Sequence, residues 1–197
     1  MPCAIAAKLP VASQLHGLMP LDSVPRTIIN MLLTNYRTAI PAEWVDYNGH
    51  LRDAFYLLIF SYATDALMDR IGLDEAGRIR TGHTLYTLEC HLNYLNEVKL
   101  GSEVEVRTHL LAYDHKRLHI HLALHCPGEE QLLAASEQML MNIDRSVGRS
   151  APFDEAVLEA VRALHEGQKN LPRPIHIGRV IGLPGDAGDG GSTSGSA

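Results

Sequence analysis

The sequence has few cysteines, no long hydrophobic run and no large group of basic residues. Its three cysteines, Cys3, Cys90 and Cys126, form no CxxC pair, so neither a disulfide framework nor a zinc ribbon is indicated. A reducing cytoplasm is therefore the expected location. No apolar run approaches the roughly 18 residues that cross a bilayer, and the N-terminus lacks the residue order of a signal peptide. A membrane-spanning protein is therefore not expected.

Basic residues do not gather anywhere along the chain. The net charge is -6, the sequence pI is near 6.0, and the longest basic cluster is Lys116-Arg117. Nucleic-acid backbones and anionic membranes are bound through larger basic patches, so neither is an expected partner. A small molecule is the better candidate.

Composition divides the chain into four parts. Residues 1–34 mix Pro, Ala and Leu without steady periodicity and are expected to form an irregular leader, in which residues 28–33 pack as a short helix. Residues 35–153 carry regular patterns and are expected to form one compact domain. Residues 154–184 are expected to form a helix and an extension. Residues 185–197 contain only small and polar residues, a composition that predicts a disordered tail.

The patterned region begins with a strand and a long helix. Residues 36–40 alternate as a strand does. Residues 53–71 contain neither Pro nor Gly, and Gly72 supplies a stop, which predicts a helix. The first turns of this helix are apolar nearly all round, so we expect it to be buried. A loop containing Gly77 and Gly82 is expected to follow.

Four further strands are predicted from alternation of period two. One face of the first strand would hold Tyr86, Leu88, Cys90, Leu92 and Tyr94, and the other Thr87, Glu89, His91 and Asn93. The alternation recurs in Val104, Val106, Thr108 and Leu110, in Leu118, Ile120, Leu122 and Leu124, and in Ala135, Met139, Met141 and Ile143. Short turns between them indicate antiparallel pairing. The expected fold class is α+β: an antiparallel five-stranded sheet around one long central helix, with an extra surface helix over residues 153–168.

The segment Trp44-Val45-Asp46-Tyr47-Asn48-Gly49-His50, followed by Tyr56 and Phe60, resembles the Asp-containing loop of the hotdog-fold 4-hydroxybenzoyl-CoA thioesterase family. The resemblance extends over roughly residues 36–153. The stretches 87–95, 116–119 and 149–153 look like the branch associated with carnitine breakdown, which includes betainyl-CoA thioesterases. At Leu51-Arg52 the chain departs from this branch, where a methionine and an asparagine are usual, and a charged residue there can alter acyl preference.

The resemblance implies an acyl-CoA thioesterase that hydrolyses its substrate to the free acid and CoA, without a metal or another cofactor. It implies Asp46 as the catalytic carboxylate, acting as nucleophile or general base, with Asn48 and His50 in support. Free N–H groups at the start of the buried helix would stabilise the oxyanion. Each residue also has a structural interpretation: an Asx turn or N-cap for Asp46, a turn signal for Asn48, and a hydrogen-bonded structural histidine for His50.

Four residues are candidate substrate contacts. Gly49 permits a close backbone approach, and Tyr56 offers an aromatic face to the acyl group. Glu89 is expected on the polar face of a central strand, where it either approaches the acyl pocket in a dimer or forms a salt bridge. Arg117 either meets CoA phosphates or is an ordinary surface charge. His119, His121 and His125 share one strand face, for which an exposed or intersubunit surface is favoured over a metal site.

The family usually pairs its subunits, so a homodimer or homotetramer is expected.

Two other functions are alternatives to the thioesterase. An enoyl-CoA hydratase-like hotdog enzyme would carry a Gly-Asp-x-Asn-Pro-x-His loop, and residues 46–50 lack its proline and spacing. A non-catalytic acyl-CoA-binding or regulatory hotdog domain is the other, but no helix-turn-helix pattern precedes the domain. A cystatin-like cone also wraps a helix in a sheet, but it places the long helix before most strands.

Overall fold

The computed structural model describes residues 33–182. Its elements are the strand β1 (Leu33–Ala39), a 3₁₀ turn (Ala42–Trp44), the helices α2 (Asp53–Arg70) and α3 (Glu75–Thr81), the strands β2 (His83–Tyr94), β3 (Glu103–Tyr113), β4 (Arg117–His125), β5 (Leu132–Asp144) and β6 (Arg149–Ser150), and the helix α4 (Glu155–Gln168). The predicted tail 185–197 lies outside the described residues. So does the predicted short helix 28–33, apart from Leu33, which begins β1.

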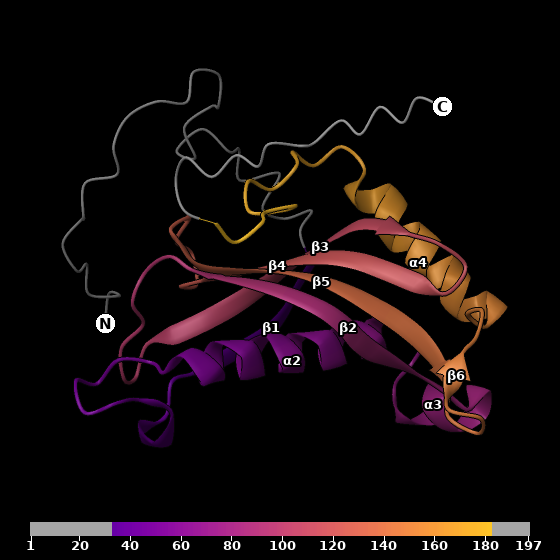
Figure 1. Cartoon of the computed structure of the whole chain (residues 1–197), viewed down its shortest axis with the longest axis horizontal. Helices are drawn as coiled ribbons and strands as arrows, with labels where there is room; N and C mark the ends of the chain where they lie inside the picture. The colour runs from indigo at the N-terminus through magenta and orange to yellow at the C-terminus, as the bar shows by residue number, and fades with distance from the viewer. Residues whose placement is uncertain (1–32, 183–197) are drawn as a thin grey trace, which may run out of the picture.

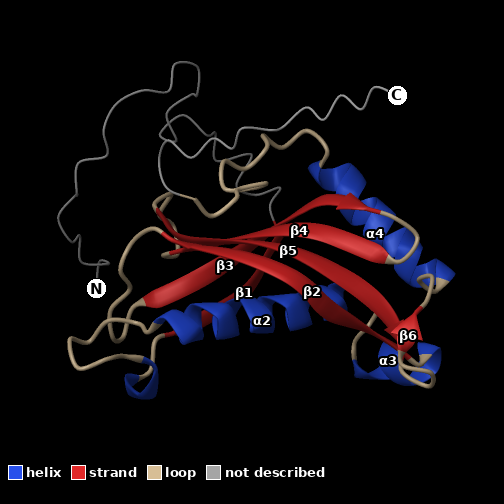
Figure 2. Ribbon diagram, in the orientation of Figure 1, coloured by secondary structure: helices blue, strands red, loops and turns tan. Residues whose placement is uncertain are grey.

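One antiparallel sheet carries the fold, with the strand order β1-β3-β4-β5-β2 and the short β6 paired to β5. Helix α2 lies along one face of this curved sheet and α4 lies on the other (Figures 1 and 2). The predicted α+β architecture is therefore confirmed. The predicted central position of the strand that carries Glu89 is wrong, because β5 pairs with both β4 and β2 and so leaves β2 at the edge of the described sheet.

Helix α2 forms the middle of the core, but it is not covered all round as expected. Ile59, Phe60 and Leu67 have no exposed surface and pack with the inward side chains of the sheet. On other sides of the helix, Leu57 and Tyr62 remain 45% and 40% exposed. The sheet therefore covers only one side of α2 within this chain. Within residues 33–182, no helix is long and apolar enough to span a membrane.

The segment after α2, predicted as a loop, contains the helix α3. Asp74 caps it by accepting a hydrogen bond from the Gly77 amide at 2.8 Å, and Gly82 ends it with a φ of 72°. A Cβ at Gly77 would lie 2.0 Å from the Gly72 carbonyl oxygen, so this glycine permits close packing inside a helix. The prediction failed because Gly77 was interpreted as a break, whereas the close approach of the Gly72 carbonyl is what requires a glycine there.

Strand β2 contains an irregularity that the alternating pattern did not reveal. Its register against β5 shifts between Thr87 and Glu89, so Leu88 is an extra residue. Tyr86 pairs with Met141 before the shift, whereas Cys90 pairs with Gln138 after it, and these two residues therefore face opposite sides of the sheet. The predicted common face from Tyr86 to Tyr94 is wrong for this reason. The bulge lies on the free edge, where bulges are frequent.

The apolar pattern of β5 indicated the wrong face for contact with α2. Its core-facing residues include the buried Ser136, Gln138 and Asn142. The Thr64 hydroxyl of α2 bonds Gln138 at 3.4 Å, and Gln138 bonds Ser136 at 3.1 Å, so these buried polar groups satisfy one another. The predicted set of Ala135, Met139, Met141 and Ile143 lies on the other face, as their pairing with outward residues of β2 and β4 requires.

Candidate functional site

The segment between β1 and α2 is a small hairpin at the entrance to the helix. Val45 and Leu51 form an antiparallel bridge, and the Asp46 amide donates to the His50 carbonyl at 2.9 Å. Gly49 closes the turn with a φ of 77°, in the left-handed region that glycine adopts without strain. The hairpin is held against the loop after β2 because the Leu51 amide donates to the Val98 carbonyl at 2.8 Å.

The Asp46 carboxylate organises this hairpin. Its Oδ1 accepts the amides of Asn48 at 2.8 Å and His50 at 3.0 Å. Its Oδ2 accepts no hydrogen bond from the described residues 33–182. The His50 amide lowers the pKa of Asp46 below its ordinary value, against a smaller opposing effect of desolvation and with further help from the Asn48 amide. Asp46 is therefore an ionised carboxylate at neutral pH, with one oxygen engaged by the turn.

Asn48 and His50 differ in what their side chains do. Asn48 is exposed and contributes its backbone amide to the turn. The His50 side chain reaches Glu97 in the loop after β2, with 3.4 Å between Nε2 and Oε2. His50 therefore links the hairpin to the loop after β2.

Helix α2 begins without a side-chain cap, since its N-cap residue is Arg52, whose side chain instead donates to the Val45 carbonyl at 3.1 Å. Free amides were expected from Asp53 to Phe55, but two of the three are used. The Ala54 amide donates to Asp53 Oδ1 at 2.8 Å, and the Phe55 amide donates to the Arg52 carbonyl at 3.0 Å. The structure records no acceptor for the Asp53 amide among residues 33–182. This amide lies at the positive end of the helix dipole and is the available donor of the first turn.

A pocket of about 350 Å³ opens beside this helix start. Its lining consists of Leu51, Asp53, Tyr56, Tyr94, Leu95, Asn96 and Glu97. Burial raises the pKa of Tyr56 to about 12 and also raises the pKa of Tyr94. Both tyrosines are therefore neutral at physiological pH. Leu51 joins the pocket to the hairpin, because its bridge to Val45 places it next to Asp46.

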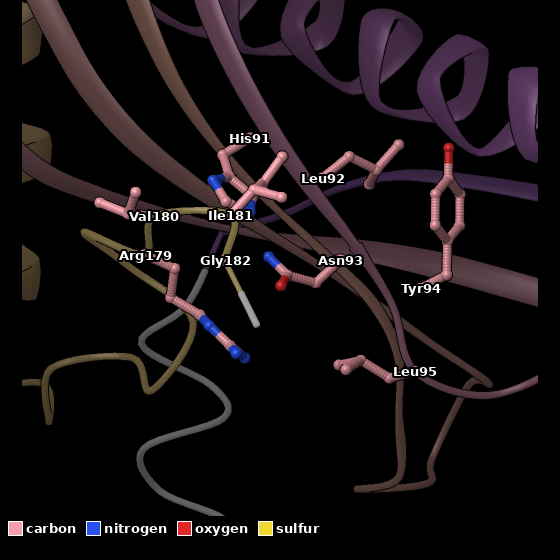
Figure 3. Close-up of a pocket in the computed structure, with 9 residues that line it drawn as sticks. All are labelled: His91, Leu92, Asn93, Tyr94, Leu95, Arg179, Val180, Ile181 and Gly182. Atoms are coloured by element: carbon pink, nitrogen blue, oxygen red, sulfur yellow. The ribbon is translucent and has the colours of Figure 1, made fainter. Parts of the chain in front are cut away.

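A second pocket, of about 400 Å³, lies on the other side of the β2 end. His91 and Asn93 line it together with the chain segment from Arg179 to Gly182 (Figure 3). In Figure 3 the Tyr94 side chain points toward α2, whereas Asn93 and Arg179 lie on the opposite side of the strand. Only the first pocket combines the helix start with the Asp46 hairpin.

The structure brings some predicted site residues together and leaves others apart. Asp46, Asn48, Gly49 and His50 share one hairpin, and Tyr56 lines the pocket beside it. Glu89 is exposed on β2, on the side away from α2, where it pairs in register with Met139. Arg117 begins β4 and forms an ion pair with Asp114 at 2.6 Å. Met141 of β5 is the register partner of both Arg117 and Tyr86. Arg117 therefore lies level with the Tyr86 end of β2, opposite to the Tyr94 end that lines the pocket.

Asp53 and Glu97 were not recognised from the sequence as contributors of charge to the site. Glu97 lies in a turn without periodicity, and its position next to Tyr56 depends on how β2 ends. Asp53 was considered only for its backbone amide. An acidic residue at the first position of a helix is common for reasons of the helix dipole, so its presence did not indicate a site.

Contrary to expectation, the histidines on the outer face of the sheet are not exposed. His121 is 5% exposed, and desolvation, helped by the neighbouring His109 and His176, lowers its pKa to about 4. His119 contacts Glu137 at 2.7 Å, and Glu137 also accepts the Gly178 amide from the segment after α4. That segment covers the face within the same chain. Among residues 33–182, no three His, Cys, Asp or Glu side chains are grouped so as to hold a metal ion.

Comparison with known proteins gives consistent matches. Residues 40–161 match the model of the thioesterase-like superfamily. The chain is 62% identical over 156 residues to a betainyl-CoA thioesterase of Pseudomonas aeruginosa, covering 79% of this chain and 98% of that protein. It is 37% identical to an L-carnitine dehydrogenase/betainyl-CoA thioesterase of Rhizobium meliloti, over 74% of this chain and 29% of that longer protein. A Staphylococcus aureus protein solved in complex with CoA superposes with a TM-score of 0.72 at 30% identity, covering 78% of this chain and 97% of that one.

Proposed function

The chain belongs to the thioesterase-like superfamily and is an acyl-CoA thioesterase, and we propose that its substrate is betainyl-CoA, which it hydrolyses to betaine and CoA. The observation that carries this proposal is the 62% identity to a betainyl-CoA thioesterase, which extends over 98% of that protein. The matched region contains the Asp46 hairpin and the helix start beside it. The hydratase-like and non-catalytic alternatives have no comparable support.

In the proposed reaction, the thioester carbonyl lies between the Asp46 hairpin and the first turn of α2. The ionised Asp46 carboxylate either attacks the carbonyl carbon or takes a proton from the attacking water, and both routes need its unengaged oxygen. The carbonyl oxygen gains negative charge and accepts a hydrogen bond from the Asp53 amide. The C–S bond then breaks and releases CoA as a thiolate. In the first route this leaves a mixed anhydride with Asp46, which water hydrolyses to the acid and the free carboxylate. In the second route the water supplies the second oxygen of the acid, and the proton held by Asp46 passes to the thiolate or to solvent.

We propose that the working enzyme is a homodimer joined through β2. This strand is a free edge of twelve residues, and Tyr86, Leu88 and Tyr94 on it are each more than half exposed. A centred antiparallel pairing of β2 with its copy would put Glu89 of the partner subunit opposite Leu88, in the middle of the interface and on the face away from α2. The same pairing would bring Arg117 of the partner subunit toward the end of β2 that lines the pocket, so the proposed contact of Arg117 with CoA is a contact across the interface, whereas Glu89 is proposed to be an interface residue.

The two described cysteines are free thiols, which fits a proposed location in the cytoplasm.

The acyl-CoA proposal is tested by following release of free CoA with a thiol reagent. Purified enzyme is given betainyl-CoA, an aryl-CoA and short and medium straight-chain acyl-CoA esters. We expect betainyl-CoA to have the highest kcat/KM. A higher kcat/KM for an aryl or straight-chain ester would overturn the substrate assignment.

The interface proposal is tested with Leu88→Lys, which puts a charge on the free edge, and with Ile79→Lys as a matched control. Ile79 is 75% exposed on α3, outside the strand. Light scattering after size exclusion should give a dimer for the wild type and for Ile79→Lys, and a shift toward monomer for Leu88→Lys. An unchanged mass for Leu88→Lys, or a monomeric wild type, would contradict an interface through β2.

A further inference from the structure

The pocket beside the helix start has a chemistry that suits a positive charge. Two of its seven lining residues are carboxylates, Asp53 and Glu97, and none is lysine, arginine or histidine. Among residues 33–182, the one basic side chain in contact with either carboxylate is His50, whose Nε2 lies 3.4 Å from Oε2 of Glu97. An anionic acyl group would meet like charge here, whereas a cationic one would meet opposite charge.

Two aromatic rings complete the same wall. Tyr56 and Tyr94 meet edge to face, with 5.2 Å between their ring centroids. Each hydroxyl donates to a backbone carbonyl at 3.3 Å, that of Tyr56 to Asn96 and that of Tyr94 to Asp53. These bonds fix the rings between the helix start and the end of β2. Neutral aromatic faces attract cations, and they do so best when water is excluded.

A betainyl group makes a specific geometric demand on such a pocket. Its trimethylammonium is one methylene away from the thioester carbonyl, so the cation and the oxyanion donor must lie side by side. Asp53 satisfies this demand, because its amide is the available donor of the first turn and the same residue lines the pocket and carries a carboxylate. A quaternary ammonium has no N–H to donate, so hydrogen-bond acceptors alone would not hold it, and aromatic faces with nearby carboxylates are the appropriate partners.

We propose that Tyr56, Tyr94, Asp53 and Glu97 form a quaternary-ammonium subsite that selects the acyl group. This inference rests on the proposed function, since it specifies how the same active site recognises a betainyl thioester. Glu97 and Tyr94 are its specificity-determining residues, because Tyr94 ends β2, Glu97 lies in the loop after it, and neither belongs to the helix start that serves the carbonyl oxygen.

The test compares betainyl-CoA with 3,3-dimethylbutanoyl-CoA, in which a carbon replaces the ammonium nitrogen and the shape is kept. The readout is the ratio of kcat/KM for the two esters, measured on each purified dimeric variant. We expect the wild type to prefer betainyl-CoA and Glu97→Gln to reduce that ratio about ten-fold. Tyr94→Leu should reduce the ratio by a similar factor, whereas Tyr94→Phe, which keeps the ring, should hold it within about two-fold.

Glu75→Gln serves as the matched control, because it removes one acidic charge from an exposed position on α3 at the other end of the sheet. Its ratio should equal that of the wild type. If Glu97→Gln and Tyr94→Leu also leave the ratio unchanged while both esters are hydrolysed, the ammonium subsite is wrong and the thioesterase assignment stands. If the wild type hydrolyses neither ester, the proposed substrate itself fails.

Discussion

Asp46 and Asp114 each organise a tight turn in the same way, by accepting two backbone amides on one carboxylate oxygen. Asp114 Oδ1 accepts the amides of Lys116 at 2.8 Å and Arg117 at 2.7 Å, as Asp46 Oδ1 accepts those of Asn48 and His50. The second oxygen distinguishes them. Asp114 Oδ2 is held by the Arg117 guanidinium at 2.6 Å, whereas Asp46 Oδ2 accepts no bond from the described part of the chain.

The two carboxylates also have different surroundings. Desolvation raises the pKa of Asp114, but hydrogen bonds from the Lys116 amide and from Arg117 outweigh it and lower the pKa to about 2. Asp114 is thus fully committed to its turn. Asp46 belongs to the hairpin whose Leu51 lines the pocket at the helix start, and no hydrogen bond from residues 33–182 engages its remaining oxygen. A turn-forming aspartate is therefore no evidence against chemistry, and the decisive feature is the oxygen that the turn leaves unengaged.

The largest difference between the two turns should appear when each aspartate becomes asparagine. Asp46→Asn keeps an acceptor for the turn but removes the base, so we expect kcat to fall by about 10² to 10⁴. Steady-state CoA release measures this loss, and far-UV circular dichroism verifies the fold. Residual kcat above about one tenth of the wild type would remove Asp46 from the chemistry.

The second effect concerns the glycine that closes the Asp46 hairpin. Gly49→Ala places a side chain at a φ of 77°, with open space around the Cβ, so the cost is conformational, about 1 kcal/mol. Distortion of the hairpin should also lower kcat/KM about ten-fold. Gly148→Ala is the matched control, since Gly148 has a φ of 63° and open space in the turn between β5 and β6. It should show the same loss in urea unfolding with normal activity; equal activity in both variants would contradict a special role for the Asp46 hairpin.

The opposite outcome is expected at Asp114, where the substitution should leave activity nearly unchanged. Asp114→Asn loses a charge-assisted contact with the partly exposed Arg117, so we expect at most about 1 kcal/mol of lost stability and kcat within two-fold of the wild type. Urea unfolding and CoA release on one preparation give both values. A loss of activity comparable to that of Asp46→Asn would mean that the two turns do not differ as described.

The smallest effect is expected at His50, which links the hairpin to Glu97. His50→Gln retains a donor, and a CoA thiolate leaves without obligatory protonation, so kcat should change by no more than about three-fold. A loss of about a hundred-fold would instead assign His50 an acid or base role in the reaction.

The sequence was sufficient for the core architecture because local patterns set it. The absence of Pro and Gly predicted α2 nearly to the residue, and short turns predicted the antiparallel strands. The bulge at Leu88 was missed because it depends on the pairing of β2 with β5, and the helix around Gly77 was missed because a glycine inside it was interpreted as a break. The hairpin of the site was recognised through a family resemblance. The pocket beside the hairpin was not predicted, because Glu97 and Tyr56 come to line the same pocket only when the end of β2 lies beside the start of α2.

The most direct test of the central claim uses the unmodified enzyme, in which the hairpin and its hydrogen bonds are left as they are. The folded pKa of Asp46 is lowered, so its ionised form persists as pH falls to below the ordinary aspartate pKa of about 3.9. We predict that kcat/KM for 3,3-dimethylbutanoyl-CoA, whose uncharged acyl group does not depend on the carboxylates of the ammonium subsite, is constant from about pH 5 to 8 after correction for spontaneous hydrolysis, with an acid limb only below about 3.9 in enzyme that remains folded. An acid limb near neutral pH, where histidine titrates, would contradict the assignment of the reaction to Asp46.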